Sequence, residues 1–144
     1  MTKPPLADVP IRSAADLTSR WAAVLDPPIF GARSLWLTWF GADGRMLPVV
    51  VPVDDVPEQF DHRMTSGLLH LSDAVTEEHL AGAGHLAMAL CRPGGPEVTD
   101  DDYEWAEDLR SAVDDQLDGT WSLHLAAGGR VSELLTPPFR VGPR

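Results

Sequence analysis

Cysteine is almost absent from this 144-residue chain, which contains only Cys91. A single thiol cannot form an intramolecular disulfide, so the fold must be held by its core, and a reducing compartment is favoured. Apolar runs long enough to cross a bilayer are also missing, and residues 1–5 are followed by polar residues rather than by the apolar segment of a secretory signal. We therefore expect a cytoplasmic protein that does not enter a membrane.

Basic residues are scarce, with 11 Lys and Arg against 22 Asp and Glu, which gives a formal net charge of −11. This balance repels phosphate backbones, so it excludes nucleic-acid binding driven by nonspecific charge attraction. A basic partner protein would complement such a surface, whereas solubility alone is the simpler explanation of the charge.

The length and the 44% content of hydrophobic residues are typical of one globular domain with its own core. We expect a flexible N-terminal arm over residues 1–12, a single domain over 13–135 and a flexible C-terminal tail over 136–144.

The first half of the domain reads as a helix followed by a hairpin. Ser13 and Asp16 have the spacing of a capping box, and Asp26 with the two prolines after it ends the helix. Its apolar face is formed by Leu17, Trp21, Val24 and Leu25. Residues 34–40 are apolar on both alternating faces, which predicts an interior strand. After the turn 41–44, a second strand begins at Met46, and Pro48 and Pro52 favour an edge position for it.

The second half alternates helices and strands. Apolar residues at 68, 69, 71 and 75 predict a helix, and residues 76–80 either continue it or form another turn. Residues 85–91 predict a buried strand that ends at the Pro/Gly-rich turn 93–96. The next helix has its apolar face at Ala106, Leu109, Val113 and Leu117. Strands at 121–125 and 131–135 follow, joined by a turn at Gly128 and Gly129. The order α-β-β-α-β-α-β-β predicts an α/β fold with a mixed sheet flanked by helices.

Residues that could support chemistry have a structural explanation in each case. Asp102 and its two acidic neighbours could bind metal or act as a base, but Thr99 and Asp102 have capping-box spacing. The five histidines, at 62, 70, 79, 85 and 124, show no zinc-binding spacing, although they could still converge in space. A half-buried packing role is favoured for His124. Cys91 has no neighbouring base in the sequence, and Gly94 and Gly95 belong to no phosphate-binding motif.

The stretch from Leu90 to Val113 resembles the RadC branch of the JAB/MPN (JAMM metalloprotease-like) family. In that family a strand ends in His-x-His-Pro, and a Ser-x-x-Asp motif follows a short Gly/Pro loop. Here Leu90 and Arg92 stand at the positions of the two histidines, whereas Thr99 and Asp102 stand at the positions of the Ser and Asp. The resemblance extends over about residues 34–135 and implies a cytidine-deaminase-like architecture.

What the resemblance implies for function depends on these departures. The family binds zinc through the two histidines and the aspartate, and Asp102 alone remains of those three ligands, so zinc hydrolysis is disfavoured. Arg92 is instead expected to pair with Asp102 or another acidic residue and hold the loop to the start of the helix. We predict a noncatalytic protein-interaction or scaffold module without cofactor or metal, with Arg92, Thr99 and Asp102 as binding residues. The alternatives are a hydrolase with another metal site and a thiol enzyme that uses Cys91.

Overall fold

The computed structural model describes residues 10–41, 43–79, 84–114 and 120–135. In this part of the chain it contains one α/β domain with a five-stranded mixed sheet and three helices. The elements are α1 (Ala14–Val24), β1 (Ser34–Phe40), β2 (Met46–Asp54), α2 (Met64–His79), β3 (His85–Cys91), α3 (Asp100–Val113), β4 (Thr120–Ala127) and β5 (Arg130–Leu135). The order of elements predicted from the sequence is therefore confirmed.

The strands lie in the order β2-β1-β3-β4-β5. β3 and β4 run parallel, joined by α3, while the other neighbours pair antiparallel. β2 is an edge strand, as its two prolines predict, because a proline cannot donate a ladder hydrogen bond to a second neighbour. The loop after β3 and the start of α3 thus lie at the carboxyl end of the parallel pair.

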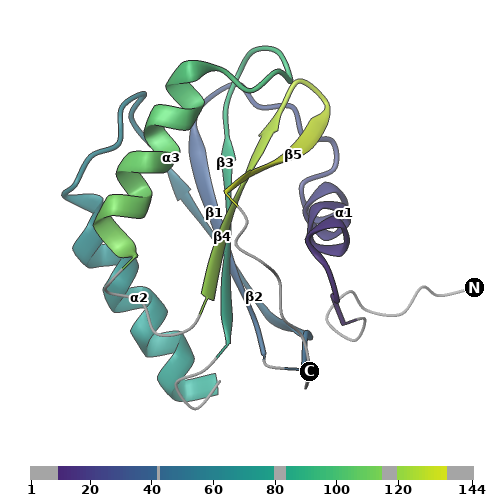
Figure 1. Cartoon of the computed structure of the whole chain (residues 1–144), viewed down its shortest axis with the longest axis vertical. Coiled ribbons are helices and arrows are strands. Elements are labelled where there is room, and N and C mark those ends of the chain that lie inside the picture. Colours follow the sequence, from purple (N-terminus) through teal and green to yellow (C-terminus); the bar gives the residue numbers. More distant parts are fainter. Residues whose placement is uncertain (1–9, 42, 80–83, 115–119, 136–144) are drawn as a thin grey trace, which may run out of the picture.

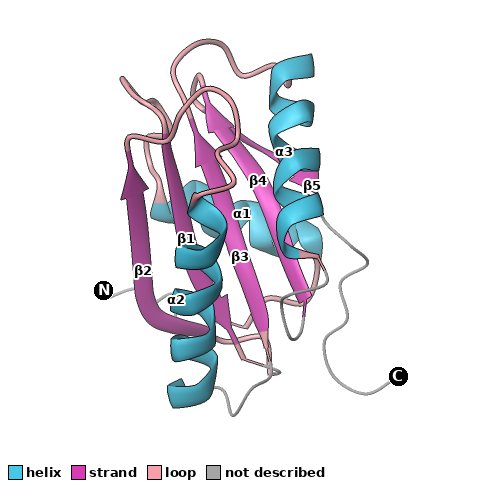
Figure 2. Cartoon of the chain, turned by 90° about the vertical axis from the view of Figure 1, so that its left-hand side faces the viewer, coloured by secondary structure: helices cyan, strands magenta, loops and turns pink. Residues whose placement is uncertain are grey.

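The helices cover both faces of the sheet. α2 and α3 lie on one face and α1 lies on the other (Figure 1, Figure 2). The face under α2 and α3 contains the larger core, in which Leu37, Trp39 and Leu90 are fully buried. The face under α1 presents small residues on β3, including Ala87 and Ala89, which leave room for the helix to pack closely. β1 is buried on both faces, as predicted for an interior strand.

The start of α1 has the predicted cap but not the complete capping box, because the Asp16 carboxylate accepts from the Arg12 N–H rather than from the Ser13 N–H. Ser13 is the N-cap, and its hydroxyl accepts a hydrogen bond from the Asp16 backbone N–H. Leu17 and Trp21 are each 1% exposed, and burial of one such side chain stabilises a fold by about 1.5–3 kcal/mol. Ile11 is also fully buried, and its N–H donates to the Gly44 carbonyl. Ile11, in the segment 1–12 expected as an arm, therefore packs against the domain.

Two further expectations concern helix ends. α2 runs without a break to His79, so residues 76–79 continue the helix rather than form a separate turn. Leu117 on the expected apolar face of α3 lies outside the described residues, as do the arm over 1–9 and the tail over 136–144. None of the helices in the described ranges is long and apolar enough to cross a membrane.

Candidate functional site

The loop after β3 is organised by a buried ion pair between Arg92 and Asp102. The Arg92 Nε lies 2.8 Å from Asp102 Oδ1, and Nη2 lies 2.7 Å from Oδ2. The two side chains are 7% and 1% exposed. This bidentate pair connects the end of β3 to the first turn of α3, as expected from the sequence.

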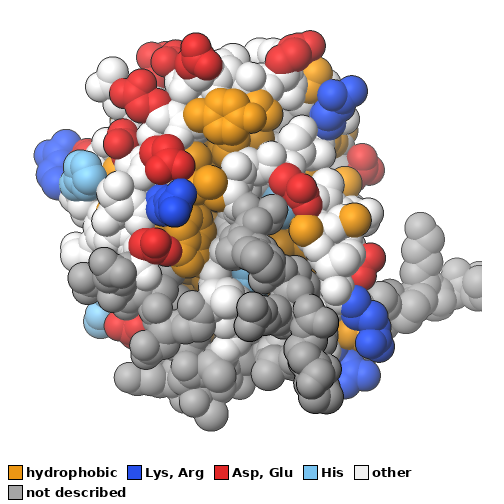
Figure 3. All heavy atoms as spheres, in the orientation of Figure 1, with side chains coloured by type: hydrophobic (Ala, Val, Ile, Leu, Met, Phe, Trp, Pro, Cys, Tyr) orange, Lys and Arg blue, Asp and Glu red, His pale blue; other side chains and the backbone are white. Residues whose placement is uncertain are grey.

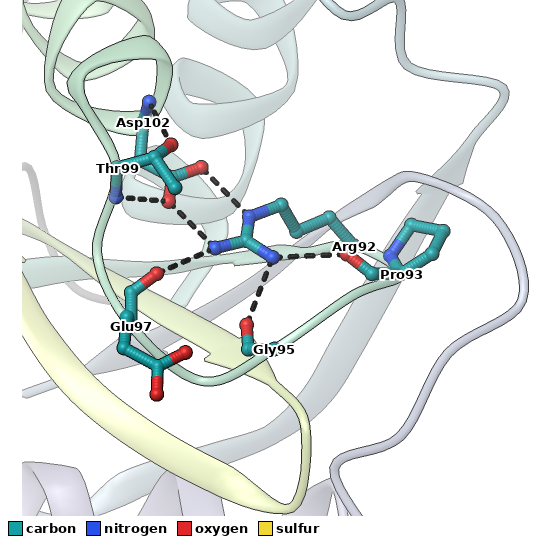
Figure 4. Close-up of polar contacts among 6 residues, drawn as sticks. All are labelled: Arg92, Pro93, Gly95, Glu97, Thr99 and Asp102. Atoms are coloured by element: carbon teal, nitrogen blue, oxygen red, sulfur yellow. Dashed lines mark hydrogen bonds and ion pairs between the residues drawn. The ribbon is translucent and has the colours of Figure 1, made fainter.

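The remaining donors of Arg92 bind the loop itself (Figure 4). Nη1 donates to the carbonyls of Pro93 and Gly95, at 2.9 and 3.0 Å, and Nη2 donates to the Glu97 carbonyl at 2.9 Å. A guanidinium has five N–H donors, and these bonds together with the two to Asp102 engage all five. Arg92 therefore has no donor left for a ligand in this arrangement.

Thr99 and Asp102 form the predicted capping box. The Thr99 N–H donates to Asp102 Oδ2 at 2.9 Å, and the Asp102 N–H donates to the Thr99 hydroxyl at 3.2 Å. Asp102 thus stabilises the helix start and the ion pair with one carboxylate. The structure brings all three sequence-predicted binding residues together, but their described contacts are with one another and the loop. That they bind a ligand stays a prediction.

The ion pair shifts the pKa values of both partners toward their charged forms. The hydrogen bonds that Arg92 donates to the Asp102 carboxylate raise the pKa of Arg92. Burial on its own raises the pKa of Asp102, but the hydrogen bonds from Arg92 and Thr99 outweigh it and hold that pKa below its ordinary value. Both groups are therefore charged at neutral pH.

The turn between β4 and β5 packs tightly against the Pro/Gly-rich loop. Gly128 has φ +57°, and a Cβ added there would lie 2.6 Å from the Pro96 backbone nitrogen and 2.9 Å from the Gly95 carbonyl carbon. Only glycine allows this approach without displacing backbone atoms. The loop is thus held by Arg92 and by the neighbouring hairpin.

Cys91 lies at the end of β3, where its thiol is fully buried. Burial raises the pKa of this thiol to about 12, with a smaller opposing contribution from a hydrogen bond with Ser34. Since the thiolate is the nucleophilic form, a thiol at this pKa is almost entirely unreactive at neutral pH. The geometry therefore disfavours the Cys91 enzyme.

Two histidines lie on the face of the sheet that α1 covers. His85 contacts the hydroxyls of Thr120 and Ser122, at 2.6 and 2.8 Å, and His124 Nε2 lies 2.8 Å from the Thr18 hydroxyl. His124 is 0% exposed, so the expected half-burial was wrong, and its Nδ1 has no hydrogen-bond partner in the described structure although its Nε2 is bonded to Thr18. Burial lowers the pKa of each imidazole to about 4, and the charge of His85 contributes at His124. Among the described residues, no group of three or more His, Cys, Asp or Glu is placed to hold a metal ion.

Two cavities lie beside the loop 55–60; the smaller reaches α3, and the larger reaches Pro93 in the loop after β3. The smaller cavity, of about 80 Å³, is lined by Arg33, Glu58, Gln59, Phe60, Asp101, Glu104, Trp105 and Asp108. The larger and more open cavity, of about 560 Å³, is lined by Ala32, Arg33, Asp55, Val56, Pro57, Glu58 and Pro93. Arg33 and Glu58 line both. We call these two cavities together the acidic groove.

Carboxylates dominate the acidic groove. Its lining contains Asp55, Glu58, Asp101, Glu104 and Asp108 against the single cation of Arg33. Figure 3 shows Asp and Glu side chains gathered at the upper left of the molecule, over α3. None of the described ion pairs involves Arg33. The groove therefore has an excess of negative charge that the one cation of Arg33 does not balance.

Sequence reasoning missed this groove. The one available signal was the spacing of residues 101, 104 and 108, which places three carboxylates on one face of a helix. Arg33 and Glu58 come from two loops, and the fold alone brings those loops to α3. Comparisons of the chain with protein-family models, curated proteins and solved structures gave no match.

Proposed function

We propose that this protein is a noncatalytic protein-interaction module that binds a basic segment of a partner protein in the acidic groove. The observation that supports this function is the groove itself, in which five carboxylates and one arginine line two cavities that share Arg33 and Glu58. Such a concave acidic site attracts cationic partners and repels anionic ones. A basic partner also fits the net charge of −11.

The same proposal places the module on a metal-free JAB/MPN-like scaffold. Two observations support it. A strand, a Pro/Gly-rich loop and a capped helix follow one another in the chain, and Arg92 at the second histidine position contacts Asp102. Arg92 engages both oxygens of Asp102, the remaining ligand position of the family motif, through charge-assisted hydrogen bonds. A metal ion at Asp102 would have to displace this guanidinium and leave a buried cation without its partner, which is costly.

The proposed function is tested by capture of partners from a lysate of the native host with two immobilised variants. Glu104→Gln/Asp108→Asn removes two carboxylates from the groove, and Glu107→Gln/Glu133→Gln removes two exposed carboxylates outside it. The proposal predicts that a specific basic protein is captured by the wild type and the second variant and is lost with the first. Equal capture by all three forms would contradict the proposal. So would a result in which none of the captured proteins is lost when the groove carboxylates are removed.

A further inference from the structure

His124 on β4 connects the sheet to α1 through a hydrogen bond with Thr18. Its Nε2 lies 2.8 Å from the Thr18 hydroxyl oxygen, and that oxygen lies 3.0 Å from the Ala14 carbonyl oxygen. A carbonyl can only accept and a hydroxyl has one proton, so both bonds form together only if Thr18 donates to Ala14 and accepts from the Nε2–H of His124. The geometry therefore places the imidazole proton on Nε2 and leaves Nδ1 as the unprotonated nitrogen.

A second proton on His124 would find no acceptor in the part of the chain that the structure describes. The ring is 0% exposed, and its Nδ1 has no hydrogen-bond partner among the described residues. The core under α1 is apolar and includes Leu17, Trp21 and Ala126. A buried N–H without an acceptor is costly, and a buried cation without a partner is costlier still. Protonation therefore destabilises the state in which α1 covers His124.

The charged groups around His124 do not offset this cost. In the elements packed against the ring, the titratable and charged residues are Asp16 and Arg20 of α1, His85 and Cys91 of β3, and Arg130 and Glu133 of β5. Asp16 and Glu133 are exposed, and neither is bonded to His124 in the described structure. Arg20 and His85 are buried, and as cations they would repel a protonated His124.

α1 is placed so that it can leave the sheet without breaking the rest of the fold. It covers one face of the sheet, whereas α2 and α3 cover the other (Figure 1, Figure 2). Among the described residues, the core on that other face contains no residue of α1. Because α1 precedes all of the described strands, its departure breaks no strand pairing. Such an element can open as a unit of its own, below the free energy of global unfolding.

We propose that the contact between His124 and Thr18 is a pH switch, in which protonation of His124 releases α1 while the sheet and the core under α2 and α3 stay folded. The released state exposes the small-residue face of the sheet that includes Ala87 and Ala89. The switch involves no residue that lines the acidic groove and does not depend on the function proposed for that groove.

The direction and size of the pH response follow from the imidazole. Burial, with a smaller contribution from the charge of His85, lowers the pKa of His124 from 6.5 to about 4. Release of α1 exposes the ring to water and returns this pKa toward 6.5, so the open state binds more protons. The closed state is favoured fully above pH 6.5 and loses that advantage as the pH falls toward 4. From pH 7 to pH 5 the ratio of open to closed molecules rises about 20-fold.

The test is native-state hydrogen exchange of the full chain at pH 7 and pH 5, corrected for the intrinsic exchange rates, with α1 compared with α3. We expect the protection of the α1 amides to lie below that of α3 at both pH values and to fall about 20-fold between them. Equal protection of the two helices would mean that α1 opens only with global unfolding, and it would overturn the proposal. So would an α1 protection that does not change with pH.

The variant His124→Gln separates protonation from packing. Glutamine keeps an N–H that can donate to Thr18 but gains no proton, so α1 protection is expected to change by less than about two-fold between the two pH values. His70→Gln, at an exposed position of α2, is the matched control and should keep the wild-type response. A wild-type response of α1 in His124→Gln would show that another group is the sensor.

Two further measurements do not depend on the folding of the glutamine variant. Thr18→Val removes the acceptor of the Nε2–H and is expected to lower α1 protection at pH 7 by about five-fold, the effect of one hydrogen bond. Unchanged protection in this variant would contradict the switch. Long-range ¹H–¹⁵N spectra of the wild type at pH 7 report which ring nitrogen of His124 carries the proton. We expect Nε2, and a proton on Nδ1 would overturn the proposal.

Discussion

Removing one member of the Arg92–Asp102 pair is expected to destabilise the protein severely. In Arg92→Met, the Asp102 carboxylate, 1% exposed, loses both guanidinium contacts, and three loop carbonyls lose their donors. Breaking a buried pair in this way costs about 3–5 kcal/mol, a large fraction of the roughly 5–15 kcal/mol that holds a domain folded. Asp102→Leu leaves the Arg92 charge buried and also removes the capping box, which adds about 1 kcal/mol.

The double variant Arg92→Met/Asp102→Leu tests whether the cost arises from the unpaired charge. Because neither charge remains, we expect its loss of stability to be smaller than the sum of the two single losses by at least about 2 kcal/mol. Arg45→Met is the control, since its ion pair with Asp43 is 58% and 57% exposed, and it should change stability by less than about 1 kcal/mol.

Urea unfolding at pH 7, followed by tryptophan fluorescence and far-ultraviolet circular dichroism, measures these differences. The reasoning is refuted if the unfolding free energy of Arg92→Met lies within about 1 kcal/mol of that of the wild type. It is also refuted if the loss of stability in the double variant equals the sum of the two single losses.

The remaining predictions concern three other places in the fold. The folded-state pKa values of His85 and His124 lie near 4, below the 6.5 of a free imidazole, so the unfolded chain binds more protons. Their contribution to stability is full above pH 6.5 and falls as the pH drops toward 4, by about 2 kcal/mol per histidine at pH 5. Urea unfolding curves at pH 7.5 and 5.0 measure this loss of stability. The same loss between these pH values in His85→Asn/His124→Asn would contradict the prediction. Cys91 is expected to react with a disulfide reagent such as 5,5′-dithiobis(2-nitrobenzoic acid) only after unfolding in urea; labelling of the folded protein within minutes at pH 8 would disprove its inertness. Gly128→Ala is expected to lower the unfolding free energy by more than about 1 kcal/mol beyond Gly129→Ala. Both glycines have positive φ, but only Gly128 would clash with the loop, so equal thermal shifts would argue against that contact.

The sequence predicted the elements best where glycine and proline mark their ends. β3 spans the predicted residues 85–91, because Gly84 and the turn beginning at Pro93 bracket a short apolar run. The Ser13 cap, the capping box of Thr99 and Asp102 and the edge position of β2 also follow from local rules. The ion pair could be predicted from the sequence, because Arg92 and Asp102 belong to one short strand–loop–helix segment.

The sequence could not predict features formed by distant segments. His124 Nε2 has its hydrogen-bond partner because α1 brings Thr18 over the sheet, 106 positions away in the chain. Likewise, residues 101, 104 and 108 read as an ordinary solvated helix face until the two loops with Arg33 and Glu58 close a groove against them. The chemistry of the groove therefore depends on tertiary packing, which the spacing of residues along one helix does not predict.

The affinity of a short arginine peptide, acetyl-Gly-Ser-Arg-Ser-Gly-amide, for the acidic groove tests the proposed function most directly. Isothermal titration calorimetry at 50 mM and 300 mM NaCl would compare the wild type, Glu104→Gln/Asp108→Asn and Glu107→Gln/Glu133→Gln. The account predicts that the groove variant binds about ten-fold more weakly at low salt, about 1.4 kcal/mol, that the surface variant stays within about two-fold of the wild type, and that salt weakens wild-type binding. Equal dissociation constants for all three forms at both salt concentrations would contradict it.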